Sequence, residues 1–328
     1  GATAYSPGGV GSMCRFDWSS SLSNKIGSMS CTLPPMEPRS SGRPCQPMHS
    51  WVRAYLATPF GGRSHRGAWP ADAYYGDIDG TWTDSWRVST GGSWPRIHNV
   101  VGDGKFDQSS IPSDVDLMVG RVDLSDLPAF APATETDLLR SYLERDHAFR
   151  HAQTTVSRQA IVDDHLRSLS EAVSVTARSG FSAAVGRAAV LDRDWPDISG
   201  GGSYLMGAGF GYASWTAING VATSASLAAS DASVVFSLFF GSYFGDWDNS
   251  DNVLRAAIAG GGATLASGFN GRPQWQLHGL GTGAPLGAVV RESQNARAGD
   301  PYYTSYYSRL VHVALHLSLI HISEPTRR

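Results

Sequence analysis

The sequence predicts an α/β fold with a mostly parallel sheet and helices on both of its faces. From about residue 65 onward, segments with strand character alternate with segments of helical periodicity. The segment 234–240 is apolar apart from Ser237, a pattern typical of a short strand that is buried on both faces. That strand runs into the polar stretch GSYFGDWD, and parallel strands end in this way where a sheet binds ligands.

The predicted elements follow one another along most of the chain. The helix that contains Leu139, Tyr142, Leu143 and Phe149 on one face begins at Thr134 or Thr136, since either hydroxyl can cap it. In order, the predictions are strand 115–124, helix 134–152, strand 158–164, helix 170–186, strand 203–206, strand 234–240, helix 251–259, strand 263–269, helix 284–293 and strand 310–315.

Composition and charge exclude several function classes. The chain has 328 residues, of which 41% are hydrophobic and 17% charged, so it can bury a sizeable core. A formal net charge of -3, without any run of lysine or arginine, argues against a nucleic-acid or membrane-surface partner. No apolar stretch is long enough for a membrane span.

The two ends of the chain differ in composition from the middle. Residues 1–64 carry scattered serine, proline, glycine and arginine and contain all three cysteines, Cys14, Cys31 and Cys45. Their spacings match no zinc or redox motif. We expect this segment to be poorly ordered, either as a true linker or as a partly out-of-frame translation. The predicted domain then spans residues 65–316.

The last stretch, LSLIHISEPTRR at 317–328, resembles the translation of a transposon-end adapter used in sequencing libraries. The match runs over eleven consecutive residues, from Leu317 to Arg327. We interpret the stretch as read-through from a metagenomic assembly, with a frayed native terminus as the alternative. On this interpretation the domain is truncated at its last strand, and residues 317–328 should pack against nothing.

The central segments resemble the gingipain-type cysteine peptidases. The resemblance rests on DAYYGDIDGTWTDS at 72–85, on DVDLMVGRVDL at 114–124, and on a helix that ends in YLERDHAFRH. The strand end IVDD at 161–164 also fits this order. The resemblance covers about residues 65–316 and implies a caspase-like fold, with a catalytic histidine after one strand and a catalytic cysteine after the next.

Both positions of that dyad are vacated in this chain. The Gly-His-Gly motif of the family aligns with Gly207, Ala208 and Gly209, so that Ala208 stands where the base should be. The cysteine belongs between Phe240 and Ser242, and no cysteine occurs after Cys45. Thiol catalysis needs a thiolate and a nearby base. The resemblance therefore implies a peptidase fold without its chemistry.

Two functions remain open at this point. The first is a degenerate peptidase domain of a secreted bacterial protein that acts as a non-catalytic binding or structural module, with a peptide or protein as ligand. The second is a hydrolase with altered catalytic residues, for which the candidates are Ser242, His165 and Asp246. A base within about 3 to 4 Å of Ser242 favours the second function. The candidate binding residues are Gly207, Gly209, Gly241 and Trp247.

Two acidic loops are candidate calcium sites. Calcium prefers several oxygen ligands on a flexible loop with glycine turns. GDIDGTWTD and GDGKFD have this composition, and DWDNSD, with Asp246, Asp248 and Asp251, is a third possibility beside the alternative of solvated turn aspartates. The predicted calcium ligands are Asp77, Asp79, Asp84, Asp103 and Asp107. At least one of these loops, with Asp77, Asp79 and Asp84 as the first candidate, is expected to bring several carboxylate or carbonyl oxygens close to a common point.

Overall fold

The computed structural model describes residues 53–56, 67–85, 100–117, 119–169, 172–198, 202–260, 264–269, 276–296 and 314–316. The predicted read-through tail at 317–328 lies outside them. So does most of the segment 1–64, although the short strand β1 (Arg53–Leu56) falls within it and pairs with β2 (Gly67–Pro70).

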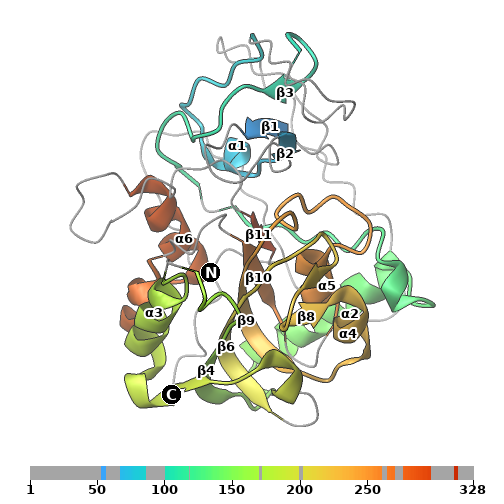
Figure 1. Ribbon diagram of the computed structural model, residues 1–328, viewed down its shortest axis with the longest axis vertical. Helices are drawn as coiled ribbons and strands as arrows, with labels where there is room; N and C mark the ends of the chain where they lie inside the picture. Colours follow the sequence, from blue (N-terminus) through green and yellow to red (C-terminus); the bar gives the residue numbers. More distant parts are fainter. Residues whose placement is uncertain are drawn as a thin grey trace, which may run out of the picture. The chain divides into compact units, whose positions relative to one another are not determined.

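The main sheet has six described strands, five of them mutually parallel (Figure 1). They are ordered β11-β10-β9-β6-β4-β5, and only β11 runs antiparallel to its neighbour. The strands are β4 (Ser157–Asp164), β5 (Val190–Asp192), β6 (Ser203–Phe210), β9 (Ser233–Phe240), β10 (Ala266–Phe269) and β11 (Ala314–His316). The predicted class, α/β with a mostly parallel sheet, is confirmed.

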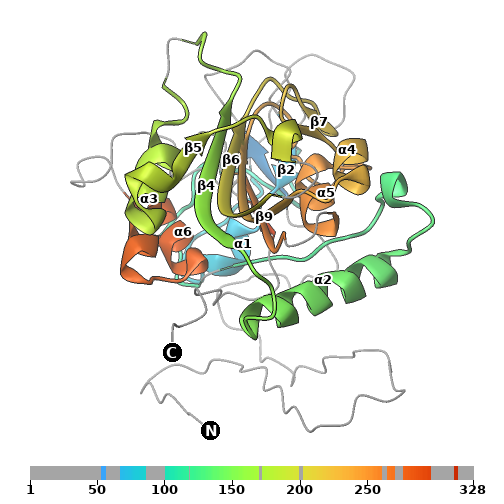
Figure 2. The ribbon, with the colours of Figure 1, turned by 90° about the horizontal axis from the view of Figure 1, so that it is seen from below.

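Helices flank both faces of this sheet (Figures 1 and 2). On one side lie α3 (Val175–Val185) and α6 (Leu286–Asn295). On the other side lie α2 (Glu135–Arg150), α4 (Ser224–Ala229) and α5 (Val253–Ala259). No described helix combines the length and the apolarity that a bilayer crossing needs.

Local signals explain where two of the helices begin. Thr134 caps α2 by accepting a hydrogen bond from the backbone N–H of Asp137, whose carboxylate in turn accepts one from the N–H of Thr134. This reciprocal arrangement satisfies two amides at the start of the helix. In the same way, the Asn252 side chain accepts a hydrogen bond from the N–H of Leu254 and starts α5.

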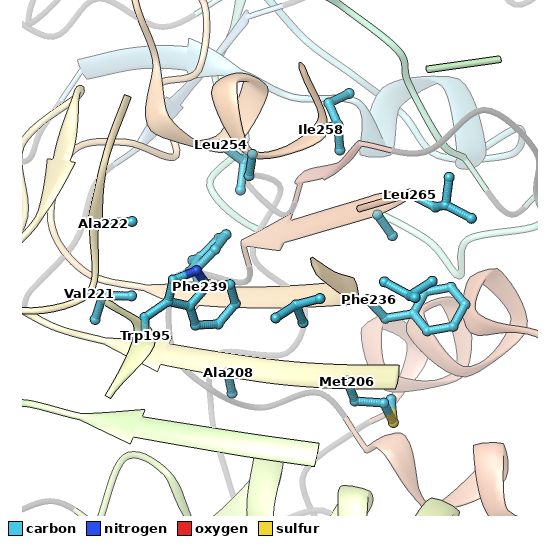
Figure 3. Close-up of a cluster of buried hydrophobic side chains, with 14 of the residues drawn as sticks. Trp195, Met206, Ala208, Val221, Ala222, Phe236, Phe239, Leu254, Ile258 and Leu265 are labelled. Atoms are coloured by element: carbon cyan, nitrogen blue, oxygen red, sulfur yellow. The ribbon is translucent and has the colours of Figure 1, made fainter. Parts of the chain in front are cut away.

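The core lies between the sheet and the helices (Figure 3). Val234 and Val235, on successive faces of β9, are both fully buried, as expected for a strand covered on both sides. Trp195 packs on Phe239 with ring centroids 5.1 Å apart. The strand predicted from VVFSLFF is therefore confirmed, and its central place in the sheet accounts for its apolar sequence.

Small elements complete the described chain. Strands β2, β1 and β3 (Lys105–Phe106) form a second sheet. The single helical turn α1 (Ala73–Gly76) follows β2 in the sequence. Strands β7 (Ala217–Ile218) and β8 (Ala222–Thr223) form a hairpin. Four 3-10 turns are also described: η3 (Pro128–Phe130), η4 (Arg187–Ala189), η5 (Trp195–Ile198) and η6 (Leu277–Thr282).

Two predictions of local structure were wrong, and two short elements were not predicted. The segment 115–124 forms no strand among its described residues, where only Arg121 makes an isolated bridge, to His316. The strand predicted at 203–206 continues to Phe210, so Gly207–Phe210 are not part of a loop. The short elements β5 and α4 were not predicted, because three and six residues are too few for a clear periodicity.

Candidate functional site

The ends of β4, β6 and β9 meet at the carboxyl edge of the parallel sheet. The backbone N–H of His165, just after β4, donates to the Phe210 carbonyl at 2.9 Å. The N–H of Gly211, just after β6, donates to the Phe240 carbonyl at 3.1 Å. These bonds extend the ladder by one residue and bring three strand tips together, at the edge where ligands bind in α/β folds.

Ala208 does not stand at a strand tip. It lies within β6, where it pairs with Val162 on one side and Leu238 on the other, and its side chain is fully buried (Figure 3). The expectation that this residue occupies a base position on a loop is therefore wrong. Strand β6 runs four residues further than predicted, and Gly211 and Tyr212 come after its end.

Gly207 and Gly209 serve packing in this structure. A Cβ atom on Gly207 would lie 2.7 Å from Val234 and 2.9 Å from the Trp195 ring. A Cβ atom on Gly209 would lie 2.5 Å from Val221 and 3.1 Å from Phe239. Both glycines are buried, so the predicted ligand contacts of these two residues have no support in the geometry.

We expect Gly207→Ala to lower the free energy of unfolding by about 1–3 kcal/mol, because overpacking a dense core forces side chains off their rotamers. Urea denaturation measures the change. Gly279→Ala is the control, since its nearest contact would be 3.1 Å from Val289 and the next 3.5 Å. If Gly207→Ala were as stable as the wild type, the core around Trp195 would be able to accommodate the added methyl group without loss.

The tip of β9 holds Gly241 and the half-buried Ser242. A Cβ atom on Gly241 would lie 2.5 Å from the Gly211 carbonyl oxygen, so the two tips approach at backbone distance. Tyr243 follows with a φ of 67°, a left-handed conformation that turns the chain away from the strand. The carbonyl of Ser242 accepts a hydrogen bond from the N–H of Phe244 at 2.8 Å.

Asp246 and Trp247 hold the loop after β9 in place. Asp246 is 1% exposed and accepts hydrogen bonds from the Trp215 indole at 3.3 Å and from the Asn249 amide at 3.0 Å. Trp247 is also 1% exposed, with the Arg121 guanidinium 4.9 Å from its ring centroid and the His316 ring 5.2 Å away. An enclosed indole offers no face to a ligand, so the predicted binding role of Trp247 has no support in the geometry.

Asp163, His165 and Asp194 come together beside the tip of β4. Their candidate ligand atoms all lie within 4.8 Å of one another. Asp163 is 1% exposed and its Oδ2 accepts a hydrogen bond from the Trp195 N–H at 2.7 Å. Burial raises the pKa of Asp163 above its usual value, although the Trp195 amide and His165 act in the opposite direction.

The predicted set Ser242, His165 and Asp246 is not assembled. Among the described residues, no hydrogen bond joins any two of these side chains. Strand β6 separates β4 from β9, so their tips stand roughly 10 Å apart at about 4.8 Å per strand. His165 instead places its Nε2 atom 2.8 Å from the Oδ1 atom of Asp163.

The predicted calcium loops use their carboxylates as hydrogen-bond acceptors. Asp77, fully buried, accepts from the Gly80 N–H at 3.0 Å and the Trp82 indole at 3.0 Å, and also from Ser113. Asp84 accepts from the N–H groups of Gly102 and Gly104. These hydrogen bonds stabilise the conformation of the loops, which is the effect that a bound ion would have.

Asp103 and Asp107 have similar structural partners, while Asp79 is exposed. Asp103 forms an ion pair with Lys105, and Asp107 accepts from Thr83 and Ser85. Within the part of the chain that the structure describes, Asp163, His165 and Asp194 are the only three acidic or histidine side chains that gather closely enough for a metal ion. The carboxylates of Asp77, Asp79 and Asp84 do not gather in this way, and calcium binding stays a prediction.

The comparisons with known proteins returned nothing. No protein-family model, curated protein or solved structure matches this chain.

Sequence reasoning missed several residues of this edge and its support. Asp194 follows β5, a strand too short to be predicted, so its approach to His165 had no signal in the sequence. Tyr212, which is 55% exposed at the tip of β6, was not among the candidate residues, since its exposure has no signal in the sequence. Arg255 is fully buried, and only the tertiary structure supplies its partners, Asp123 and Ser125.

Proposed function

We propose that this chain carries a gingipain-like, caspase-fold domain without thiol catalysis, which binds a peptide or protein ligand at the carboxyl edge of its sheet. The observation that carries the proposal is the composition of the three adjacent tips. They present His165, Gly211 with Tyr212, and Gly241 with Ser242. None of these residues supplies a sulfur nucleophile, and all three cysteines lie in the first 45 residues.

The order of elements supports the caspase-like assignment. A parallel sheet with helices on both faces is closed by a strand, β11, near the predicted end of the domain. The resemblance in the sequence adds the secreted bacterial setting to the proposal. The fold class alone is compatible with many functions, so the site has to carry the functional argument.

The arrangement of the tips favours binding over hydrolysis. A serine hydrolase needs a base in hydrogen-bond reach of the hydroxyl. The Nε2 atom of His165 lies 2.8 Å from the Oδ1 atom of Asp163, and Asp246 is held by Trp215 and Asn249. Tyr212, in contrast, exposes an aromatic ring between the two flanking tips, and exposed tyrosine rings are common anchors of peptide and protein interfaces.

We expect no cleavage of peptides that contain arginine or lysine, because loss of both members of a nucleophile-base pair costs several orders of magnitude in rate. Purified chain is incubated with fluorogenic Arg and Lys peptides, with and without a thiol-alkylating reagent. Cleavage that alkylation abolishes would overturn the proposal. Cleavage that survives alkylation but is lost in Ser242→Ala would establish the serine hydrolase instead.

Binding is tested separately with a random peptide library displayed on phage. We expect selected peptides to lose at least tenfold in affinity for Tyr212→Ala, since truncation of an aromatic anchor commonly costs more than 1 kcal/mol. Leu143→Ala is the matched control, because Leu143 is 49% exposed on α2. Peptides that bind both variants equally would place the binding surface away from the three tips.

A further inference from the structure

The side chains of Asp163, His165 and Asp194 form a cluster in which the contact between Asp163 and His165 is close but lacks hydrogen-bond geometry. The Nε2 atom of His165 and the Oδ1 atom of Asp163 are only 2.8 Å apart, yet Oδ1 has no hydrogen-bond partner. Asp163 is 1% exposed. A buried carboxylate oxygen without a hydrogen bond is costly, and native structures normally satisfy such an atom.

A shared cation accounts for this geometry. Metal-bound nitrogen and oxygen atoms sit at about 2.0–2.2 Å from the ion, so two ligands at right angles lie on the order of 3 Å apart without pointing at each other. The pair Nε2 and Oδ1 has that separation and lacks hydrogen-bond alignment. A carboxylate oxygen of Asp194 lies within 4.8 Å of a ring nitrogen of His165 and of a carboxylate oxygen of Asp163, so Asp194 supplies a third ligand.

The three side chains are positioned by residues around them. The N–H of Trp195 binds the Oδ2 atom of Asp163 at 2.7 Å, which leaves Oδ1 for another partner. Trp195 directly follows Asp194 and is anchored in the core against Phe239. On the other side, Gly220 has a φ of 83° and lies so close to the imidazole of His165 that a Cβ atom there would approach it to 2.5 Å.

We propose that Asp163, His165 and Asp194 bind a divalent first-row transition metal ion at the carboxyl edge of the sheet. One imidazole with two carboxylates suits zinc, cobalt or manganese, whereas calcium prefers a set of oxygen ligands only. His165 and Asp194 are exposed, so solvent or a ligand carboxylate can complete the coordination. The inference is independent of the proposed function, since it requires only these three side chains.

Zinc and cobalt titrations of the metal-free full chain test the site. All proteins carry Cys14→Ser, Cys31→Ser and Cys45→Ser, because thiolates would bind either ion elsewhere. Calorimetry with zinc should give one ion per chain, and cobalt should give visible absorption of a bound ion. Saturating zinc should also raise the melting temperature, since the ion binds the folded state.

The variants locate the binding. We expect Asp194→Ala and His165→Gln each to weaken zinc binding at least tenfold, and both side chains are exposed, so folding should be retained. Asp192→Asn is the matched control, because Asp192 is exposed on the neighbouring β5 and pairs with Arg167 and Arg178. No binding by the parent protein, or equal binding by Asp194→Ala and the parent, would overturn the proposal.

Discussion

Replacing Arg255 by methionine is expected to lower the free energy of unfolding by about 3–5 kcal/mol, the usual cost of removing one member of a buried ion pair. The Arg255 side chain is fully buried. One of its terminal nitrogens donates to Asp123 at 3.2 Å and to the Ser125 carbonyl at 2.5 Å. The other donates to the Asn249 carbonyl at 2.6 Å, so Arg255 also ties down the loop after β9.

The charge on Asp123 is the reason for the large effect. Burial by itself raises the pKa of Asp123, but the Ser125 hydroxyl and then Arg255 lower it, and the net pKa is below the usual value. Without Arg255, a mostly buried carboxylate loses its cationic partner. Adding Asp123→Asn to Arg255→Met should therefore restore more than about 1 kcal/mol, because the uncompensated charge is removed.

Urea denaturation of the two single variants and the double variant gives the coupling between these residues. Arg140→Met is the control for the loss of a guanidinium. Arg140 pairs with Asp137 on the surface of α2, where both side chains are about half exposed, and such pairs contribute about 0–1 kcal/mol. If Arg255→Met were no more damaging than Arg140→Met, the buried pair would not support the loop.

The stability of the folded chain is expected to fall as the pH drops below about 6.5, and His316 should contribute much of this loss. His316 is fully buried, and burial lowers its pKa from 6.5 to about 3. Asp123 opposes this shift, whereas Arg121 and Arg255 add to it. Neither ring nitrogen of His316 has a hydrogen-bond partner that could stabilise the charged form.

The direction of the pH effect follows from proton uptake. Between pH 6.5 and about 3, the unfolded chain protonates at His316 while the folded chain does not. Stability therefore rises with pH in this window, by at most about 1.4 kcal/mol per unit from this residue. The depressed pKa of Asp123 acts in the same direction at lower pH, since its stabilising contribution is lost on acidification.

His316→Phe isolates this contribution. Phenylalanine keeps an aromatic ring against Trp247, which the His316 ring meets at 86°, but cannot take up a proton. We expect the variant to reduce the slope of the unfolding free energy against pH between 6.5 and 4.5, by up to the contribution of one bound proton. His278→Gln, a change at an exposed histidine, serves as the comparison. A slope unchanged in His316→Phe would assign the acid sensitivity to other groups.

The alternation of strands and helices, the central position of β9 and the capped start of α2 follow from the sequence by itself. Each depends on neighbours in the chain: an apolar run over 234–240, or a threonine three residues before an aspartate. Short-range periodicity and capping act over one or two turns. For this reason the sequence predicts the fold class and the order of the major elements.

The candidate sites depend on contacts that only the tertiary structure decided. Ala208 lies within the sheet and not at the predicted tip because β6 pairs with β4 and β9 as far as Phe210, a matter of register that one strand's sequence does not contain. Asp194 reaches Asp163 and His165 only because β5 pairs in parallel with β4. Aspartates predicted as calcium ligands accept hydrogen bonds from amides and hydroxyls that are distant in the sequence, as Asp77 does from Ser113. A buried carboxylate binds the donors that folding brings close to it.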